Sequence, residues 1–103
     1  METRANYLLI GAVTLLGIVA TFAFLKRGDA TALYEVAPLV IADRRDLIQK
    51  AFGWMLREAG KRCDAAQLLS YLRDNAHAMG RTALSYATEH LDTRTRAELR
   101  ARR

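Results

Sequence analysis

Trp54 stands between two basic residues at helical spacing, within the stretch DRRDLIQKAFGWMLREAGKR at residues 43–62. Lys50 precedes it by four residues and Arg57 follows it by three, so the three side chains would share one surface of a helix. An aromatic ring flanked by cations suits stacking on a nucleotide beside a phosphate backbone. The alternative is a core tryptophan whose neighbours are solvated charges, and the residues alone favour that alternative.

Three carboxylates near the tryptophan could take part in acid–base chemistry, and each has a structural explanation. Asp43 stands where a helix N-cap would stand, Asp46 where a first-turn acid would, and Glu58 is a surface ion-pair partner. No Ser/His/Asp set, phosphate-binding loop or dinucleotide fingerprint is present. We therefore assign no catalytic residue.

Metal and disulfide chemistry have few candidate residues. Cys63 is the only cysteine, which excludes an intramolecular disulfide and a multi-cysteine metal site. His77 and His90 are too far apart in the sequence to form a helical ligand pair. We predict no metal site and no cofactor.

The net charge lies in one part of the chain. Basic residues number 16 and acidic residues 11, which gives +5. Residues 1–36 are balanced, so residues 37–103 hold the whole excess, with 13 basic and 8 acidic side chains. Such a charge favours nucleic acid or anionic lipid headgroups as partners, and a solvated basic surface is the alternative.

The elements that would position these residues follow Pro38, where the apolar residues recur with a period of about 3.6. A first helix is predicted between an N-cap at Asp43 and a stop at Gly60. Gly53 lowers helix propensity by about 1 kcal/mol relative to alanine, so a backbone or a ligand should come close there. The predicted buried face is Leu47, Ile48, Ala51, Phe52, Met55 and Ala59.

Further amphipathic segments complete this half of the chain. Gly80 separates two of them, and the third has Leu99 as its only large apolar residue but carries five arginines. The fold class is therefore all-α: a short array of helical hairpins whose apolar edge would be covered by a neighbouring repeat or a partner protein. The predicted segments are residues 65–78 after a cap at Asp64, residues 83–91 after a cap at Thr82, and residues 92–103.

The N-terminal part carries an uncharged run from Tyr7 to Leu25. At about 1.5 Å per residue it nearly spans a hydrocarbon core of roughly 30 Å. We favour an uncleaved, single-pass transmembrane helix in contact with the lipid bilayer; a signal sequence cleaved near residues 30–32 is the rival, and a buried core helix is disfavoured. Lys26 and Arg27 follow the run, which predicts cytoplasmic C-terminal helices by the positive-inside rule.

Two stretches resemble the C-terminal HEAT-like repeats of the DNA alkylation repair family, the AlkD-like glycosylases. They are RDLIQKAFGWMLREAGKR at residues 45–62 and MGRTALSYATEHL at residues 79–91, where Gly80 replaces an expected proline. The resemblance extends from residue 38 to about residue 100. It implies a cleft in which the tryptophan helps to line the site around the damaged nucleotide.

This resemblance makes Trp54, Lys50, Arg57 and Arg81 candidate DNA-binding residues. The family excises positively charged alkylated bases, with a catalytic carboxylate in repeats that precede the tryptophan-bearing helix. Here the apolar run occupies that place, so we expect weak, non-specific binding of duplex DNA without catalysis. The predicted domains are residues 1–36, with the tail, membrane helix and linker, and residues 37–103, a partial repeat domain.

The first residues resemble a different family. METRANYLLIGAVTLLGIVATFAF is similar to the start of bacterial mammalian-cell-entry (MCE) proteins, which transport lipids in the cell envelope. TALYEV, residues 31–36, would then be a first β-strand, although the rest of the MCE domain is missing. Two segments of different origin would meet near residues 34–38, by natural fusion, engineering or a spurious reading frame. An MCE-type lipid-transport accessory or a small membrane interaction module is the alternative function.

Overall fold

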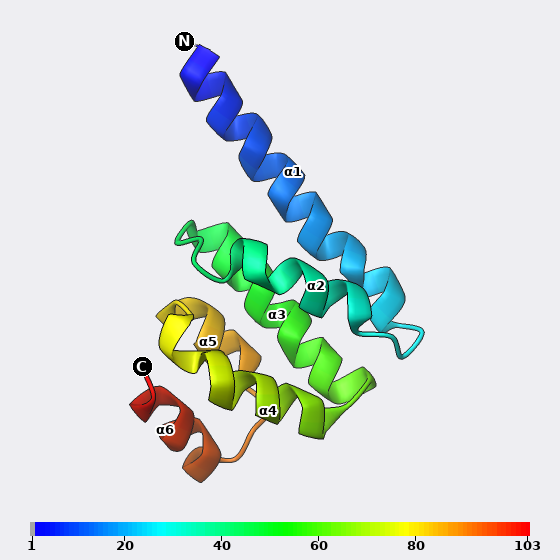
Figure 1. Cartoon of the computed structure of the whole chain (residues 1–103), viewed down its shortest axis with the longest axis vertical. Coiled ribbons are helices and arrows are strands. Elements are labelled where there is room, and N and C mark those ends of the chain that lie inside the picture. Colours follow the sequence, from blue (N-terminus) through cyan, green and yellow to red (C-terminus); the bar gives the residue numbers. More distant parts are fainter. Residues whose placement is uncertain (1) are drawn as a thin grey trace.

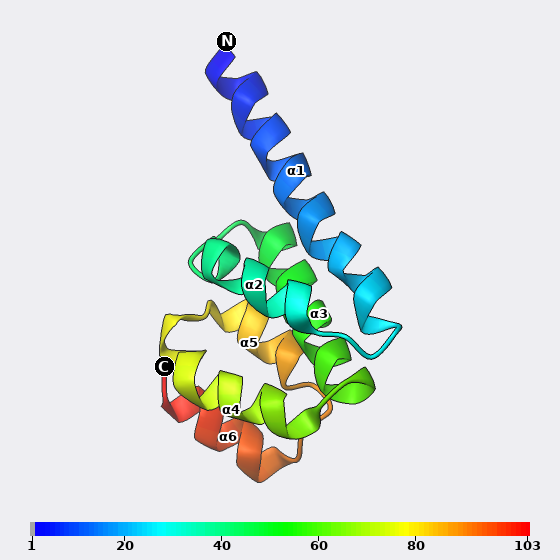
Figure 2. The same cartoon turned by 45° about the vertical axis from the view of Figure 1, so that its right-hand side comes forward.

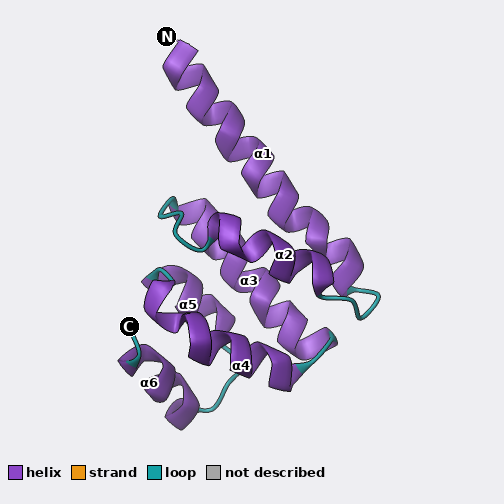
Figure 3. Ribbon diagram, viewed as in Figure 1, coloured by secondary structure: helices purple, strands orange, loops and turns teal. Residues whose placement is uncertain are grey.

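The computed structural model describes the backbone of residues 2–103 and the side chains of residue 6 and residues 8–103. All regular secondary structure in this part is helical, as the predicted all-α class requires (Figure 3). The elements are α1 (Glu2–Leu25), α2 (Thr31–Val40), α3 (Asp46–Arg62), α4 (Ala65–Asn75), a 3-10 turn (Ala76–Ala78), α5 (Arg81–Ala87) and α6 (Thr93–Ala101).

Helix α3 lies at the centre of the molecule, and α1, α2, α4 and α5 pack around it (Figures 1 and 2). Phe52, Met55 and Leu56 are at most 1% exposed and supply its part of the core. Of the face predicted to be buried, only Leu47 is exposed. Because α3 touches four other helices, it sets the positions of the side chains discussed below.

The two halves of α1 have different surroundings. Its N-terminal half projects beyond the helical body (Figure 1), whereas Ile18 and Leu25 are fully buried in the common core. The segment Leu8–Leu25, with a mean hydropathy of 2.5, is long and apolar enough to cross a membrane by length and composition. Core helices and signal sequences can meet the same criterion. The C-terminal half of α1 is thus part of the packed body.

Helix α2 replaces the β-strand expected at residues 31–36, so that prediction was wrong. The turn before it contains Gly28, whose φ of 83° suits glycine. Leu33, Ala37 and Val40 are buried at helical spacing. The helix also continues through Pro38, where a break was expected. Proline removes one backbone donor near the end of this helix, and burial of the apolar face offsets that loss.

The ends of α3 differ from the predicted ends. Arg45, not Asp43, occupies the N-cap position, and the Asp43 carboxylate accepts the Arg45 backbone N–H at 3.0 Å. Gly60 lies inside the helix rather than at its end. Glycine fits there because Leu68 of α4 packs where a Cβ would stand. The α3 C-cap is therefore Cys63.

The later helices follow the sequence more closely. Asp64 caps α4 by accepting the Gln67 backbone N–H at 3.0 Å, as predicted. Gly80 separates the 3-10 turn from α5 but is itself the N-cap, so the cap predicted at Thr82 is wrong and α5 begins and ends earlier than expected. The tail forms α6, in which Leu99 is fully buried.

Gly53 lies where α3 and α5 approach each other most closely. A Cβ at this position would lie 2.5 Å from the carbonyl oxygen of Ala83 and 2.7 Å from Cβ of Tyr86. The expectation that a backbone comes close at Gly53 is confirmed. This contact brings the end of α5 close to α3, where Glu89, just beyond α5, pairs with Arg57.

Candidate nucleic-acid interface

Trp54 lies on the side of α3 that faces α1, and 46% of its surface is exposed. Its ring centroid is 6.3 Å from that of Phe22 on α1, and the ring planes are tilted by 34°. Part of the indole is therefore packed and part is accessible. A hollow of about 340 Å³, the Trp54 groove, runs beside it and is lined by Leu15, Val19, Leu47, Lys50, Ala51, Trp54 and Tyr86.

The two cations predicted to flank the tryptophan are both held by carboxylates. Lys50 Nζ lies 2.9 Å from the Asp46 carboxylate, one turn earlier in α3. Arg57 is 24% exposed and forms ion pairs with Glu89, just beyond α5, and with Glu58 at 3.3 Å. A guanidinium held in this way can contact a phosphate only if these pairs break.

Glu58 is buried, although the sequence predicted a surface ion pair. The residue is 5% exposed, and its carboxylate accepts hydrogen bonds from Arg62 Nε at 2.8 Å and from Arg57 Nη2 at 3.3 Å. The bond from Arg62 makes the largest contribution to lowering the pKa of Glu58, and Lys61 and Arg57 lower it further. Glu58 therefore stays ionised and neutralises positive charge inside this part of α3.

Arg81 lies elsewhere, in a cavity of about 390 Å³ between α5 and α6. The lining residues in and just after each helix are spaced by three, four or seven positions, which places them on one face of that helix. Both helices therefore turn one face toward this space. Tyr86, which lines the Trp54 groove, stands roughly 140° around α5 from Arg81, so the two sites are separate. We call this space the arginine cavity; its lining is Arg81, Leu84, Ser85, Thr88, Arg96, Arg100 and Arg103.

No Asp or Glu side chain lines the arginine cavity. Within the described part of the chain, none of its four arginines takes part in an ion pair. Arg96 Nε is buried without a hydrogen-bond partner among the protein atoms, whereas Arg103 Nε donates to the Met79 carbonyl at 3.0 Å. Guanidinium groups match phosphate in charge and geometry. The cavity therefore offers uncompensated positive charge and free donors to an anion.

The four residues predicted to bind DNA do not form one site. Trp54 and Lys50 line the same groove, Arg57 is withdrawn into ion pairs, and only Arg81 lies in the arginine cavity. Arg57 is separated from Trp54 and Lys50 in this way because helical spacing brings side chains to one surface but does not exclude a carboxylate partner such as Glu89.

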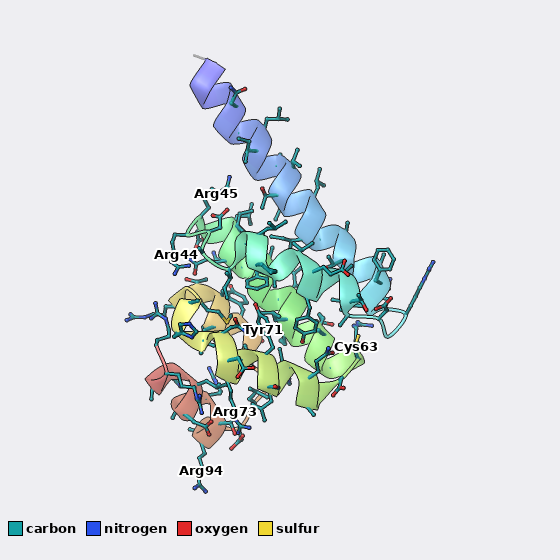
Figure 4. The ribbon with its side chains drawn as sticks, viewed as in Figure 1. Arg44, Arg45, Cys63, Tyr71, Arg73 and Arg94 are labelled. Atoms are coloured by element: carbon teal, nitrogen blue, oxygen red, sulfur yellow. The ribbon has the colours of Figure 1, made fainter. Side chains whose placement is uncertain are left out.

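The sequence analysis missed Arg96, Arg100 and Arg103 as site residues. It treated the tail as a total charge and did not examine its spacing. Their positions at i, i+4 and i+7 would have placed all three on one face of the predicted last helix. Arg94 lies on the opposite face and points away from the body of the molecule (Figure 4).

Cys63 and the acidic residues form no metal centre. The Cys63 thiol lies 3.7 Å from the Leu25 carbonyl oxygen, and burial is the main cause that raises its pKa. Among the side chains that the structure describes, no three of His, Cys, Asp or Glu are arranged so that they could hold a metal ion.

The sequence from within α1 to just beyond α5 matches a known family. A family model described as DNA alkylation repair enzyme matches residues 15–91. The chain belongs to the DNA alkylation repair enzyme family. No curated protein and no solved structure matches it. The DNA alkylation repair match includes the packed half of α1 and the whole Trp54 groove, whereas three arginines of the arginine cavity follow the matched range.

The extent of the DNA alkylation repair match differs from the expected one. It begins upstream of residue 38 and crosses residues 34–38, where α2 runs as one continuous helix. The DNA alkylation repair family therefore accounts for a longer part of the N-terminal region than the sequence analysis assigned to it. The resemblance of residues 1–36 to MCE proteins, and the division of domains at residue 36, stay predictions.

Proposed function

We propose that this chain is a helical fragment of the DNA alkylation repair family that binds duplex DNA weakly and without sequence preference. The arginine cavity carries this proposal, because several arginines gather there without a neutralising Asp or Glu side chain. Phosphate contacts supply most non-specific affinity for DNA and release bound counterions. Family membership makes DNA, among polyanions, the partner to test first.

Trp54 contributes to this function in a second place. Its exposed face could stack on an unpaired or flipped base, and such stacking is worth about 1–3 kcal/mol per base. The Trp54 groove is almost entirely apolar, so stacking there would add affinity without releasing counterions. The two sites should therefore respond differently to salt.

We propose that the chain does not excise bases by itself. The carboxylates near Trp54 all have local partners: Asp43 contacts Arg45 at 2.5 Å, Asp46 contacts Lys50, and Glu58 contacts Arg62. A carboxylate held by a cation in this way has a structural role, and none lines the Trp54 groove.

Fluorescence anisotropy with a labelled duplex tests the proposal, using the full chain in a mild detergent. If about four phosphates are neutralised, affinity should fall about 150-fold between roughly 50 and 200 mM salt. Trp54→Ala should weaken binding without changing the salt slope, and Leu47→Ala on the same groove is the matched control. Undetectable binding at low salt would refute DNA binding, and release of an alkylated base above background would refute the non-catalytic assignment.

We also propose that α1 attaches the chain to a membrane, because its projecting half exposes large apolar side chains. Val13→Glu should weaken attachment, since a charge within the hydrocarbon region opposes insertion, by about 3 kcal/mol at the centre of a span. Leu39→Glu, at an exposed position of α2, is the matched control. Wild-type protein released from membranes by salt alone would contradict the proposal. The exposed apolar residues of α1 are Leu8, Leu9, Ile10, Val13, Leu16, Val19 and Phe24.

Membrane orientation separates this function from its alternatives. A reporter at the C-terminus should be active in the cytoplasm, because Lys26 and Arg27 follow α1. Activity only outside the cytoplasmic membrane would favour the MCE-type lipid-transport accessory. Cytoplasmic activity without DNA binding would favour a membrane interaction module with a protein partner.

A further inference from the structure

Helix α6 is held to the body by few contacts. Leu99 is its only buried residue. Its polar attachments to α4 are an ion pair of Glu98 with Arg73 at 3.1 Å, and the hydrogen bond from Arg102, just beyond α6, to the Arg73 carbonyl at 3.3 Å. These attachments lie on the side of α6 away from the arginine cavity. On the side toward α5, Arg103 Nε donates a hydrogen bond to the Met79 carbonyl at 3.0 Å, but the arginines that line the cavity repel one another.

Like charges face each other across the arginine cavity. Arg81 comes from α5, whereas Arg96, Arg100 and Arg103 come from α6 and the residues after it. Guanidinium groups keep their charge at any ordinary pH, so they repel one another unless an anion lies between them. Several arginines gathered around one space, with the Nε atom of Arg96 buried and unpartnered, are typical of a site for an anion with several oxygens.

We propose that the arginine cavity binds a phosphate group that bridges α5 and α6 and thereby fixes α6 to the body. One source of the phosphate is the DNA backbone, and to that extent the inference rests on the proposed function. A small phosphorylated molecule is the other source, and the cavity of about 390 Å³ lies in the range of small-molecule sites. Both sources present the same chemistry, a tetrahedral oxyanion that accepts hydrogen bonds from several guanidinium groups.

The bridging arrangement makes binding and the docking of α6 interdependent. An anion between the helices replaces repulsion with attraction on both sides, so it stabilises the docked state of α6 over the undocked state. A ligand shifts such an equilibrium only by its difference in affinity for the two states. Binding that needs arginines from both helices provides this difference. The ligand should therefore protect the backbone amides of α6 more than those of α3.

Hydrogen exchange of the full chain in detergent tests this inference, with inorganic pyrophosphate as the probe. Sodium chloride at equal ionic strength controls for screening. We expect pyrophosphate, but not chloride, to slow exchange in α6 at least several-fold. The double variant Arg96→Gln/Arg100→Gln should lose this protection and bind pyrophosphate about 100-fold more weakly, at about tenfold for each guanidinium.

A matched double variant removes the same charge outside the cavity. Arg27→Gln/Arg94→Gln changes two exposed arginines that form no ion pair, so it should keep wild-type protection. Equal loss of protection in both double variants would show a general charge effect and overturn the inference. Equal protection by chloride, or pyrophosphate protection retained in Arg96→Gln/Arg100→Gln, would also overturn it.

A short DNA duplex forms the second arm of the experiment. Protection by duplex alone, lost in Arg96→Gln/Arg100→Gln, identifies the DNA backbone as the source and supports the bridge. Protection by pyrophosphate without any duplex binding supports the bridge but refutes the proposed DNA-binding function. If neither probe protects α6, the bridge is refuted, while duplex binding measured by anisotropy would leave the DNA-binding function intact.

Discussion

Helices α3 and α6 are both rich in basic residues, but their charges have different surroundings. Lys50, Arg57 and Arg62 of α3 each contact a carboxylate, whereas Arg96 and Arg100 of α6 contact none. Asp46 and Glu58, which pair with Lys50, Arg57 and Arg62, belong to α3 itself, and the close approach of α5 adds Glu89 as a second partner of Arg57. The number of cations in a helix therefore does not show how many are available to a ligand.

The largest effect should come from separating α3 and α5. Gly53→Ala places a Cβ against the Ala83 carbonyl oxygen, and such overpacking should lower the free energy of unfolding by about 3 kcal/mol. Urea unfolding followed by circular dichroism measures this value. Gly17→Ala is the matched control, because no atom lies within 4 Å of a Cβ there. An unchanged urea midpoint for Gly53→Ala would mean that the close approach is absent.

Removing the shared acid of α3 should have the next largest effect. Glu58→Gln leaves Arg57 and Arg62 without their common buried carboxylate, which should lower the free energy of unfolding by about 2 kcal/mol. Glu35→Gln makes the same change at an exposed position without an ion pair and should be nearly neutral. Equal losses in both variants would indicate that total charge, not the α3 ion pairs, determines stability.

The pH dependence of stability gives a second measure of the same ion pairs. The pKa of Glu58 is below its ordinary value of 4.5 in the folded protein, so the unfolded chain takes up the proton first as pH falls. The stabilisation is present above that ordinary value and is lost as pH falls through the folded pKa. Below the ordinary value, the stability of Glu58→Gln should therefore depend less on pH than the stability of the wild type. Parallel profiles would argue against the ion pairs.

Freeing one α3 cation should make α3 behave more like α6. Glu89→Gln removes a carboxylate partner of Arg57 and should raise affinity for duplex DNA at low salt about threefold, with a salt slope steeper by about one. Anisotropy titrations at several salt concentrations measure both quantities. Glu35→Gln controls for net charge and should leave the slope unchanged. A slope unchanged in Glu89→Gln would show that Arg57 does not reach phosphate even when released.

The smallest effect concerns the stability contribution of the α6 cations. Arg96→Gln should change the free energy of unfolding by less than about 0.5 kcal/mol. At low salt this variant should raise the free energy of unfolding, because it removes a charge that repels the other arginines of the cavity. Arg62→Gln, which breaks an α3 ion pair, should lower it by about 1 kcal/mol. A larger loss for Arg96→Gln than for Arg62→Gln would reverse the comparison between the two helices.

Several features of the fold could be predicted because they depend on residues near one another in the chain. The apolar period predicted α3 and α4, and Asp64 was recognised as a cap because its hydrogen bond reaches only three residues ahead. Residues 31–40 were misread, because a short apolar run is ambiguous between strand and helix and Pro38 suggested a break. Burial against α1 and α3 decided that case.

The sequence by itself determined that the chain is helical and that its positive charge lies beyond α1, since composition and local spacing carry that information. Only the tertiary structure decided which charges remain available. Arg57 is neutralised by Glu89, 32 residues later, whereas Arg81 meets the arginines of α6 in one cavity. These pairings depend on how the helices pack against one another. Packing is set by the shapes of the apolar faces and by close contacts such as that of α5 with Gly53. Spacing along one helix does not determine it.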